Sequence, residues 1–176
     1  VMTESWSNQT IGVRFENIQL PQGSIITDAK IQFSTKDPED STGDSDLNIR
    51  GELSGNAAPF QEVNDNLSNR PLTSGVVNWQ PVEWLLDDEK GDKQRTPDLS
   101  VLIQEVVDQN SWELGNALAF IITGEGQRSA NNFVSGVPPT ITIQAEVPVP
   151  NQAITNIYIN EVSPNGTDFT DEYGGY

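Results

Sequence analysis

The chain has 176 residues, with 26 acidic and 9 basic side chains, a formal net charge of −17, and neither Cys nor His. Without Cys and His, the sequence excludes disulfides, thiolate nucleophiles and imidazole acid–base chemistry, the Ser-His-Asp triad included. The negative charge opposes phosphate backbones, and no segment approaches the roughly 18 apolar residues of a membrane span, so we predict neither nucleic-acid binding nor membrane insertion.

Short alternating segments in the first third of the chain predict β-strands. Apolar residues alternate with smaller or polar ones over residues 10–15, 25–33 and 47–53, which is typical of strands with one buried face. The Pro and Gly of residues 20–23 predict a turn between the first two strands. Residues 34–45 are polar, and we expect a loop there.

One segment in the middle of the chain predicts a helix. It covers residues 97–109, with Thr96 as the expected N-cap and Pro97 at the first helical position. Apolar residues at i, i+3, i+4, i+7 and i+8 form one stripe, namely Leu99, Leu102, Ile103, Val106 and Val107. The sequence before the helix, residues 56–75, is rich in Asn, Ser and Pro and indicates loops.

Three further strands complete the prediction. Residues 76–79 read as a short strand, residues 117–123 are apolar on both faces and predict a central strand, and residues 140–145 alternate again. Several strands, long loops and one helix together favour an all-β fold, an antiparallel, jelly-roll-like β-sandwich with one short α-helix.

The domain organisation follows from a proline-rich stretch near the end of the chain. We assign residues 1–147 to the sandwich and residues 148–154 to a linker, because the prolines there favour an extended, non-periodic backbone. Residues 155–176 are expected to hold the first strand of a following domain, truncated here.

The order of these elements resembles that of DNRLRE-type domains. The matching pieces are VRF at 13–15, LPQGSIITDAKIQF at 20–33, TPDL at 96–99, IQEVV at 103–107, GNALAF at 115–120, ANNFVS at 130–135 and PPTITI at 138–143. The resemblance implies a jelly-roll sandwich of large secreted bacterial proteins, often beside polysaccharide-degrading enzymes, and some members are carbohydrate-binding modules. The long 36–45 loop departs from the pattern, so ligand contacts there do not transfer. Residues 158–165 resemble the first strand of a lamin-tail-type domain.

The acidic loop at 37–46 is a candidate calcium site. It holds five carboxylates in ten residues: Asp37, Glu39, Asp40, Asp44 and Asp46. Ca²⁺ takes about six to eight oxygen ligands, which such a loop and its carbonyls can supply. The loop is not an EF-hand, because counting from Asp40 places Ser45 where Gly is required. The alternative is a solvated acidic turn.

Two tryptophans and two arginines are candidate ligand contacts. Trp79 and Trp84 flank Pro81, and an exposed indole there would stack on a sugar ring; alternatively both indoles fill the edge of the core. Arg50 and Arg70 would bind an anionic polysaccharide if they converged. Structural pairing of such arginines with Glu52 or Glu105 is the alternative.

The sequence thus predicts a non-catalytic, extracellular carbohydrate-binding module of a multidomain secreted bacterial protein, with a polysaccharide and the other domains of the same polypeptide as partners. The Tyr residues all fall after residue 157, and neither a Gly-x-Ser-x-Gly motif nor a phosphate-binding Gly loop is present, so we do not expect an enzyme. The competing hypothesis is a structural or adhesion spacer of a surface protein or appendage, with no sugar site.

Overall fold

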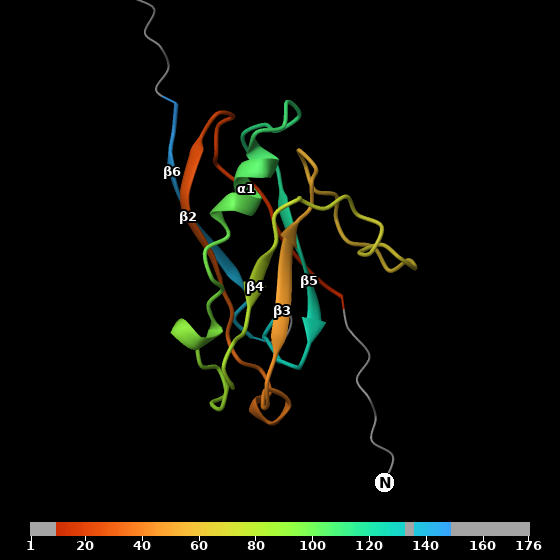
Figure 1. Cartoon of the computed structure of the whole chain (residues 1–176), viewed down its shortest axis with the longest axis vertical. Coiled ribbons are helices and arrows are strands. Elements are labelled where there is room, and N and C mark those ends of the chain that lie inside the picture. Colours follow the sequence, from red (N-terminus) through yellow and green to blue (C-terminus); the bar gives the residue numbers. More distant parts are fainter. Residues whose placement is uncertain (1–9, 133–135, 149–176) are drawn as a thin grey trace, which may run out of the picture.

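The alternating segments form six β-strands in a computed structural model that describes residues 10–132 and 136–148 (Figure 1). The strands are β1 (Ile11–Phe15), β2 (Ile25–Gln32), β3 (Asp46–Gly51), β4 (Val77–Trp79), β5 (Leu118–Glu125) and β6 (Thr140–Glu146). The helix α1 (Ser100–Val107) and two 3-10 turns, η1 (Pro38–Asp40) and η2 (Asp92–Gln94), lie in the connections. The predicted linker beyond residue 148 and the predicted strand in 155–176 fall outside the described residues.

The strands build two antiparallel sheets. One sheet has the order β1-β5-β3-β4, and the other pairs β2 with β6. The chain passes between the sheets after β1, β2 and β5, so the layers are interleaved in sequence. The predicted all-β sandwich with one short helix is confirmed. No helix within the described residues has the length and apolar character needed to cross a bilayer.

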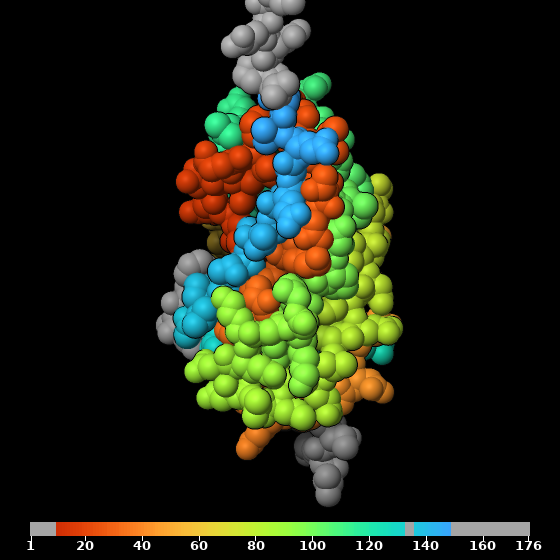
Figure 2. All heavy atoms as spheres, turned by 90° about the vertical axis from the view of Figure 1, so that its left-hand side faces the viewer, coloured from red at the N-terminus to blue at the C-terminus, as the bar shows by residue number. Residues whose placement is uncertain are grey.

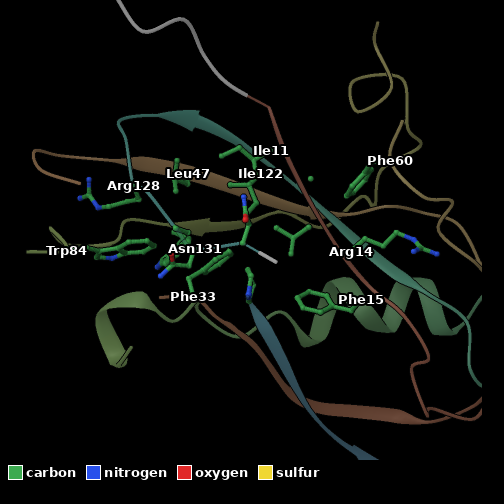
Figure 3. Close-up of a pocket in the computed structure, with 16 residues that line it drawn as sticks. Ile11, Arg14, Phe15, Phe33, Leu47, Phe60, Trp84, Ile122, Arg128 and Asn131 are labelled. Carbon is green, nitrogen blue, oxygen red and sulfur yellow. The ribbon is translucent and has the colours of Figure 1, made fainter. Parts of the chain in front are cut away.

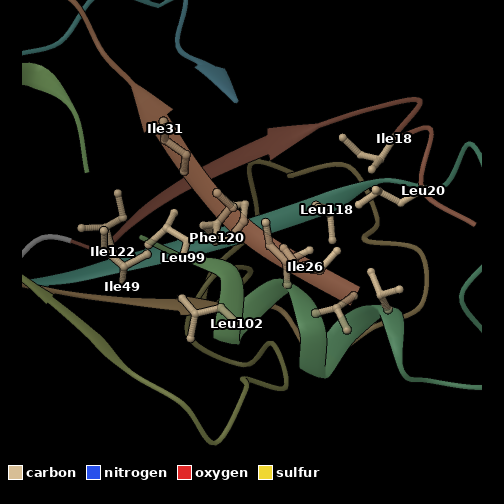
Figure 4. Packing of buried hydrophobic residues seen from close by; sticks show 14 of the residues in the cluster. Ile18, Leu20, Ile26, Ile31, Ile49, Leu99, Leu102, Leu118, Phe120 and Ile122 are labelled. Carbon is tan, nitrogen blue, oxygen red and sulfur yellow. The ribbon is translucent and has the colours of Figure 1, made fainter. Parts of the chain in front are cut away.

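The core lies between the sheets and under α1 (Figure 4). The apolar stripe of α1 is buried, as predicted. It belongs to one core cluster with inward residues of β2 and β5, and α1 itself packs on β2 and β3. Replacing one such Leu or Ile with Ala lowers the free energy of unfolding by about 2–5 kcal/mol, because the lost transfer free energy and the cost of the cavity add. The core side chains at these positions are Ile26, Ala29, Ile31, Leu102, Ile103, Val106, Val107, Leu118, Phe120 and Ile122.

The central strand β5 is buried on both faces, as its unbroken apolar sequence predicts. Its outer face is covered by the 56–73 segment, where Ala57 and Phe60 pack against Ala117 and Ala119. Glycine permits this close approach at the sheet edge, because a Cβ on Gly12 would lie 2.6 Å from the Phe60 ring.

The prediction that Thr96 caps the helix is wrong, and α1 begins later, at Ser100. The Thr96 hydroxyl instead accepts a hydrogen bond from Ile31 N at 2.9 Å, and Asp98 Oδ1 accepts one from Ala29 N at 2.9 Å. Gln104 Oε1 accepts a third from Ile26 N. Side chains of the 96–104 segment therefore satisfy the edge of β2 that faces α1, in place of another strand.

Candidate functional site

The acidic loop folds around η1 and does not gather its carboxylates. Asp37 Oδ2 accepts a hydrogen bond from Ser129 Oγ, whereas Asp46 lies in β3 and accepts one from Asn78. Glu39 lies within η1. Among the residues that the structure describes, no three or more carboxylates stand close enough together to hold a metal ion.

A guanidinium stands where the loop carbonyls converge. Arg128 Nη2 donates to Pro81 O at 2.6 Å and to Gly43 O at 2.8 Å, and Nε donates to Val82 O at 3.0 Å. Nη1 adds bonds to the carbonyls of residues 42 and 127. Burial lowers the pKa of the Arg128 guanidinium, against the opposing pull of two carboxylates, Glu83 and Asp44. Because arginine stays protonated, the half-buried Arg128 places a fixed positive charge among these carbonyls.

Beside Arg128 lies an open polar cleft of about 970 Å³, which we call the polar loop cleft. It is lined by residues 43–46 and 80–83 with Leu85, Lys93, Glu125 and Arg128. Its aliphatic side chains are largely exposed, Val82 at 58% and Leu85 at 55%. Its four acids, Asp44, Asp46, Glu83 and Glu125, line the cleft together with the donors of Gln80 and Lys93. The cleft therefore offers apolar contact area together with hydrogen-bonding groups of both kinds.

A second hollow, of about 480 Å³, is mainly apolar and lies between the two sheets (Figure 3). We call it the apolar groove. On one side are Ile11, from β1, and Ile122, from β5; Phe33 and Asn131 lie on the other (Figure 3). Its polar lining is limited to two Arg and two Asn side chains, Arg14, Arg128, Asn131 and Asn132.

The two predicted sugar-stacking residues lie in the floor of the apolar groove. Trp79 is 6% exposed and Trp84 is 1% exposed. Phe33 stacks on both indoles, with ring centroids 5.7 and 6.4 Å away, and Trp84 Nε1 donates to Lys93 O. This placement gives both residues a packing role, and sugar stacking on either indole stays a prediction.

Arg70, a predicted ligand residue, is held in a buried ion pair. Its Nη1 lies 2.5 Å from Glu52 Oε2, and the two side chains are 8% and 6% exposed. The guanidinium also donates to the carbonyls of Ala58 and Pro59 and stands 4.6 Å from the centroid of the Phe60 ring. Arg70 thus fastens the 56–73 segment onto the sheet.

Arg50, its predicted partner, lies half-buried in β3 and faces a different acid, Glu105 of α1. Burial opposes ionisation of Glu105, but hydrogen bonds from Gly75 N, Ser74 N and Ser74 Oγ outweigh it, so the pKa of Glu105 is lowered. The Arg50 charge adds to that effect. Joint binding of an anionic glycan by Arg50 and Arg70 stays a prediction.

Arg128 and the polar loop cleft are not predicted by any pattern in the sequence. Arg128 meets Pro81 and Gly43 across 47 and 85 positions, and no local pattern reports a contact of that span. The only hint in the sequence is that Arg128 is an isolated basic residue in a chain whose loops are mostly acidic. No family model, curated protein or solved structure matches this chain.

Proposed function

We propose that this chain is a non-catalytic carbohydrate-binding module of a multidomain extracellular protein and that the glycan lies in the polar loop cleft. The observation that carries the proposal is the mixed lining of that cleft. A sugar ring has apolar C–H faces and hydroxyl edges, and it needs apolar contacts with donors and acceptors around them. Val82 and Leu85 supply the apolar contacts. The hydrogen-bonding groups come from Gln80, Lys93 and Glu83.

The apolar groove fits a glycan less well. Each sugar hydroxyl buried there without a partner costs about 1–3 kcal/mol, since the lining offers few polar groups. The polar loop cleft is also the larger of the two and open to solvent, which suits a segment within a long polymer.

The walls of the polar loop cleft are held in place before any ligand arrives. Arg128 ties residues 42–43 to residues 81–82, and Glu83 Oε1 accepts a hydrogen bond from Gly43 N at 2.7 Å. A wall fixed in this way loses little conformational entropy on binding. Arg128 serves the site by positioning the walls, while Gln80, Lys93 and Leu85 contact the sugar.

The charge of the polar loop cleft selects the class of glycan. Its four acids outnumber its two bases, Lys93 and Arg128, and the guanidinium is already surrounded by carbonyls. We expect neutral polysaccharides to bind in preference to uronate or sulfate polymers, which the net charge of −17 also repels. Affinity electrophoresis over neutral and anionic polysaccharides tests both points, and retardation by no glycan would contradict the proposal.

Calcium at the 37–46 loop remains part of the proposal as a stabilising ion. In this arrangement the Thr42 and Gly43 carbonyls already accept from Arg128, so most of the ligands would have to come from the loop carboxylates, Asp37, Glu39, Asp40, Asp44 and Asp46. Melting with and without a chelator decides the matter: a lower melting temperature in chelator supports calcium, and an unchanged one removes it.

The second candidate is a structural or adhesion module without a sugar site. Burial of Trp79 and Trp84 favours it, because indoles that pack in the core expose little ring surface to a sugar. The described part of the sandwich also leaves one edge of β1 and one edge of β6 unpaired, and such edges pair readily with other strands.

A further inference from the structure

Strand β1 lies at one edge of the larger sheet, and its outer side is free. It pairs with β5 on one side, and no strand of the described residues pairs with it on the other. Figure 2 shows the start of the described chain, in red, on the outline of the molecule beyond β6 and away from β2. This red part contains β1, so the free edge of β1 is accessible to another molecule.

The backbone groups at this free edge belong to alternate residues of β1. In β5, Ala119 O accepts a hydrogen bond from Glu52 N, which follows β3. The N–H and C=O of Ala119 therefore point toward β3, and those of the next residues in β5 point toward β1, because the direction alternates along a strand. Their partners in β1 are Ile11, Val13 and Phe15. Gly12 and Arg14 thus turn their N–H and C=O groups outward, where a further antiparallel strand can bond them.

The apolar groove runs along this same strand, since all five residues of β1 line it. Val13 and Phe15 are half-buried against the core, and Ile11 is 47% exposed. Apolar area on β1 is therefore still in contact with water, and covering it would be favourable. The strand also contains neither Lys nor Pro, which commonly protect an exposed edge from pairing.

Charge favours this edge as a meeting place for two copies of the chain. Two chains of net charge −17 repel each other over most of their surface. Among the described residues that line the apolar groove there are two arginines, Arg14 and Arg128, and neither Asp nor Glu. Arg14 donates to Ala57 O and pairs with Glu16 of the same chain. A contact along β1 thus brings no cluster of acids together.

We propose that two copies of this chain pair through β1 as antiparallel neighbours, related by a two-fold axis at Val13. In this register Gly12 of each copy lies opposite Arg14 of the other, and the two residues exchange their N–H···O=C bonds. Ile11 lies opposite Phe15, and the two Val13 side chains meet at the axis. The strand is therefore complementary to itself, as a two-fold interface requires, and the two four-stranded sheets become one.

The pairing is independent of the glycan site, because no residue of β1 lines the polar loop cleft. A contact of one five-residue strand per copy is small, so the dimer should have micromolar rather than nanomolar affinity. Added salt should strengthen it, since salt screens the repulsion between two acidic chains.

Sedimentation of the full chain over a concentration series, without glycan, tests the dimer. Ile11→Lys places an ammonium on the apolar side of the contact and should weaken the dimer at least about tenfold. Ile25→Lys makes the same change at an exposed residue of β2, 58% exposed, and should leave the dimer unchanged. A chain that stays monomeric at about 1 mM, or equal weakening by the two variants, would overturn the proposal.

Backbone amide hydrogen exchange identifies the strand that pairs. The amides of Gly12 and Arg14 face the second copy, whereas that of Val13 points toward β5 in monomer and dimer alike. As the concentration rises through the midpoint of dimerisation, exchange at Gly12 and Arg14 should slow about tenfold, while Val13 stays slow throughout. Fast exchange of the Gly12 and Arg14 amides in the dimer, or slow exchange there at every concentration, would contradict pairing through β1.

Discussion

The guanidinium of Arg128 and the carbonyl of Pro81 lie 2.6 Å apart and join two loops at one end of the sandwich. Further bonds from the same side chain to Gly43 and Val82 make one residue the common anchor of the polar loop cleft. The 37–46 loop, which the sequence predicts as a calcium site, is thus already hydrogen-bonded to a positively charged side chain of the same protein, Arg128. The shape of the proposed glycan site depends on this anchor.

Replacing Arg128 should destabilise the fold. Arg128→Met keeps much of the aliphatic stem but leaves several carbonyls without their donor, and we expect a loss of about 2–3 kcal/mol in the free energy of unfolding. Arg128→Lys should recover only part of it, since an ammonium cannot reach so many carbonyls at once. Denaturant titration measures both. Arg95→Met, at an exposed arginine, is the control, and equal losses at Arg95 and Arg128 would refute the anchoring role.

The buried pair of Arg70 and Glu52 should be worth more as a pair than as two separate residues. Arg70→Ala leaves the Glu52 carboxylate buried without its partner, so we expect a cost of about 3–5 kcal/mol. Adding Glu52→Gln to that variant should restore part of the loss. A double-mutant cycle by denaturant unfolding gives the coupling, and additive effects would show that the contact contributes nothing of its own.

Stability should fall in acid, partly because of two carboxylates. Hydrogen bonds outweigh burial and lower the pKa of Asp98 below its ordinary 3.8 and that of Glu105 below its ordinary 4.5. A carboxylate with a lowered folded-state pKa stabilises the fold above its unfolded pKa, and the contribution is lost as pH falls through the folded pKa.

Glu105→Gln tests this dependence. It should be less stable than the unmodified chain near neutral pH, by about 1 kcal/mol, because charge-assisted bonds to Ser74 and Gly75 weaken. The difference should shrink as pH drops below 4.5, where the unmodified chain loses the same charge. Denaturant midpoints measured from pH 7 downwards check it, and a difference that stays constant would contradict the assignment.

Removing the Thr96 hydroxyl should weaken the closed edge of β2. Thr96→Val keeps the shape but leaves the buried Ile31 N–H without an acceptor, at a cost of about 1–3 kcal/mol. Helix content should be unchanged, because Thr96 lies outside α1. Circular dichroism together with thermal melting separates the two effects, and a loss of helix with unchanged β-structure would restore the capping role.

The strands were predictable from the sequence because their signal is local. Alternation in residues 140–145 and the unbroken apolar run of residues 117–122 each indicate burial without knowledge of any partner. The start of the helix was not predictable in the same way. Thr96 has the sequence signature of a cap, but its hydroxyl is used by Ile31, 65 positions away.

The candidate site was less predictable than the fold. The 37–46 loop was singled out by its acids, and two of them, Asp44 and Asp46, do line the polar loop cleft. The residue that organises the loop, Arg128, lies three positions after the end of β5. Its contact with the 37–46 loop depends on how the loops pack in three dimensions. The sequence around Trp79 and Trp84 was compatible with both sugar stacking and core packing. Their exposure depends on the residues packed around them, which the sequence alone does not give.

Glycan binding to matched variants tests the central claim most directly. Leu85 lines the polar loop cleft, whereas its neighbour Leu86, which is also exposed, is not among the lining residues, so Leu85→Asp and Leu86→Asp form a pair of like substitutions at exposed positions. We predict that at least one neutral polysaccharide retards the unmodified chain in affinity electrophoresis, and that Leu85→Asp weakens this binding at least about tenfold, or 1.4 kcal/mol, while Leu86→Asp does not. Retardation by no polysaccharide, or equal binding by the two variants, would contradict the account.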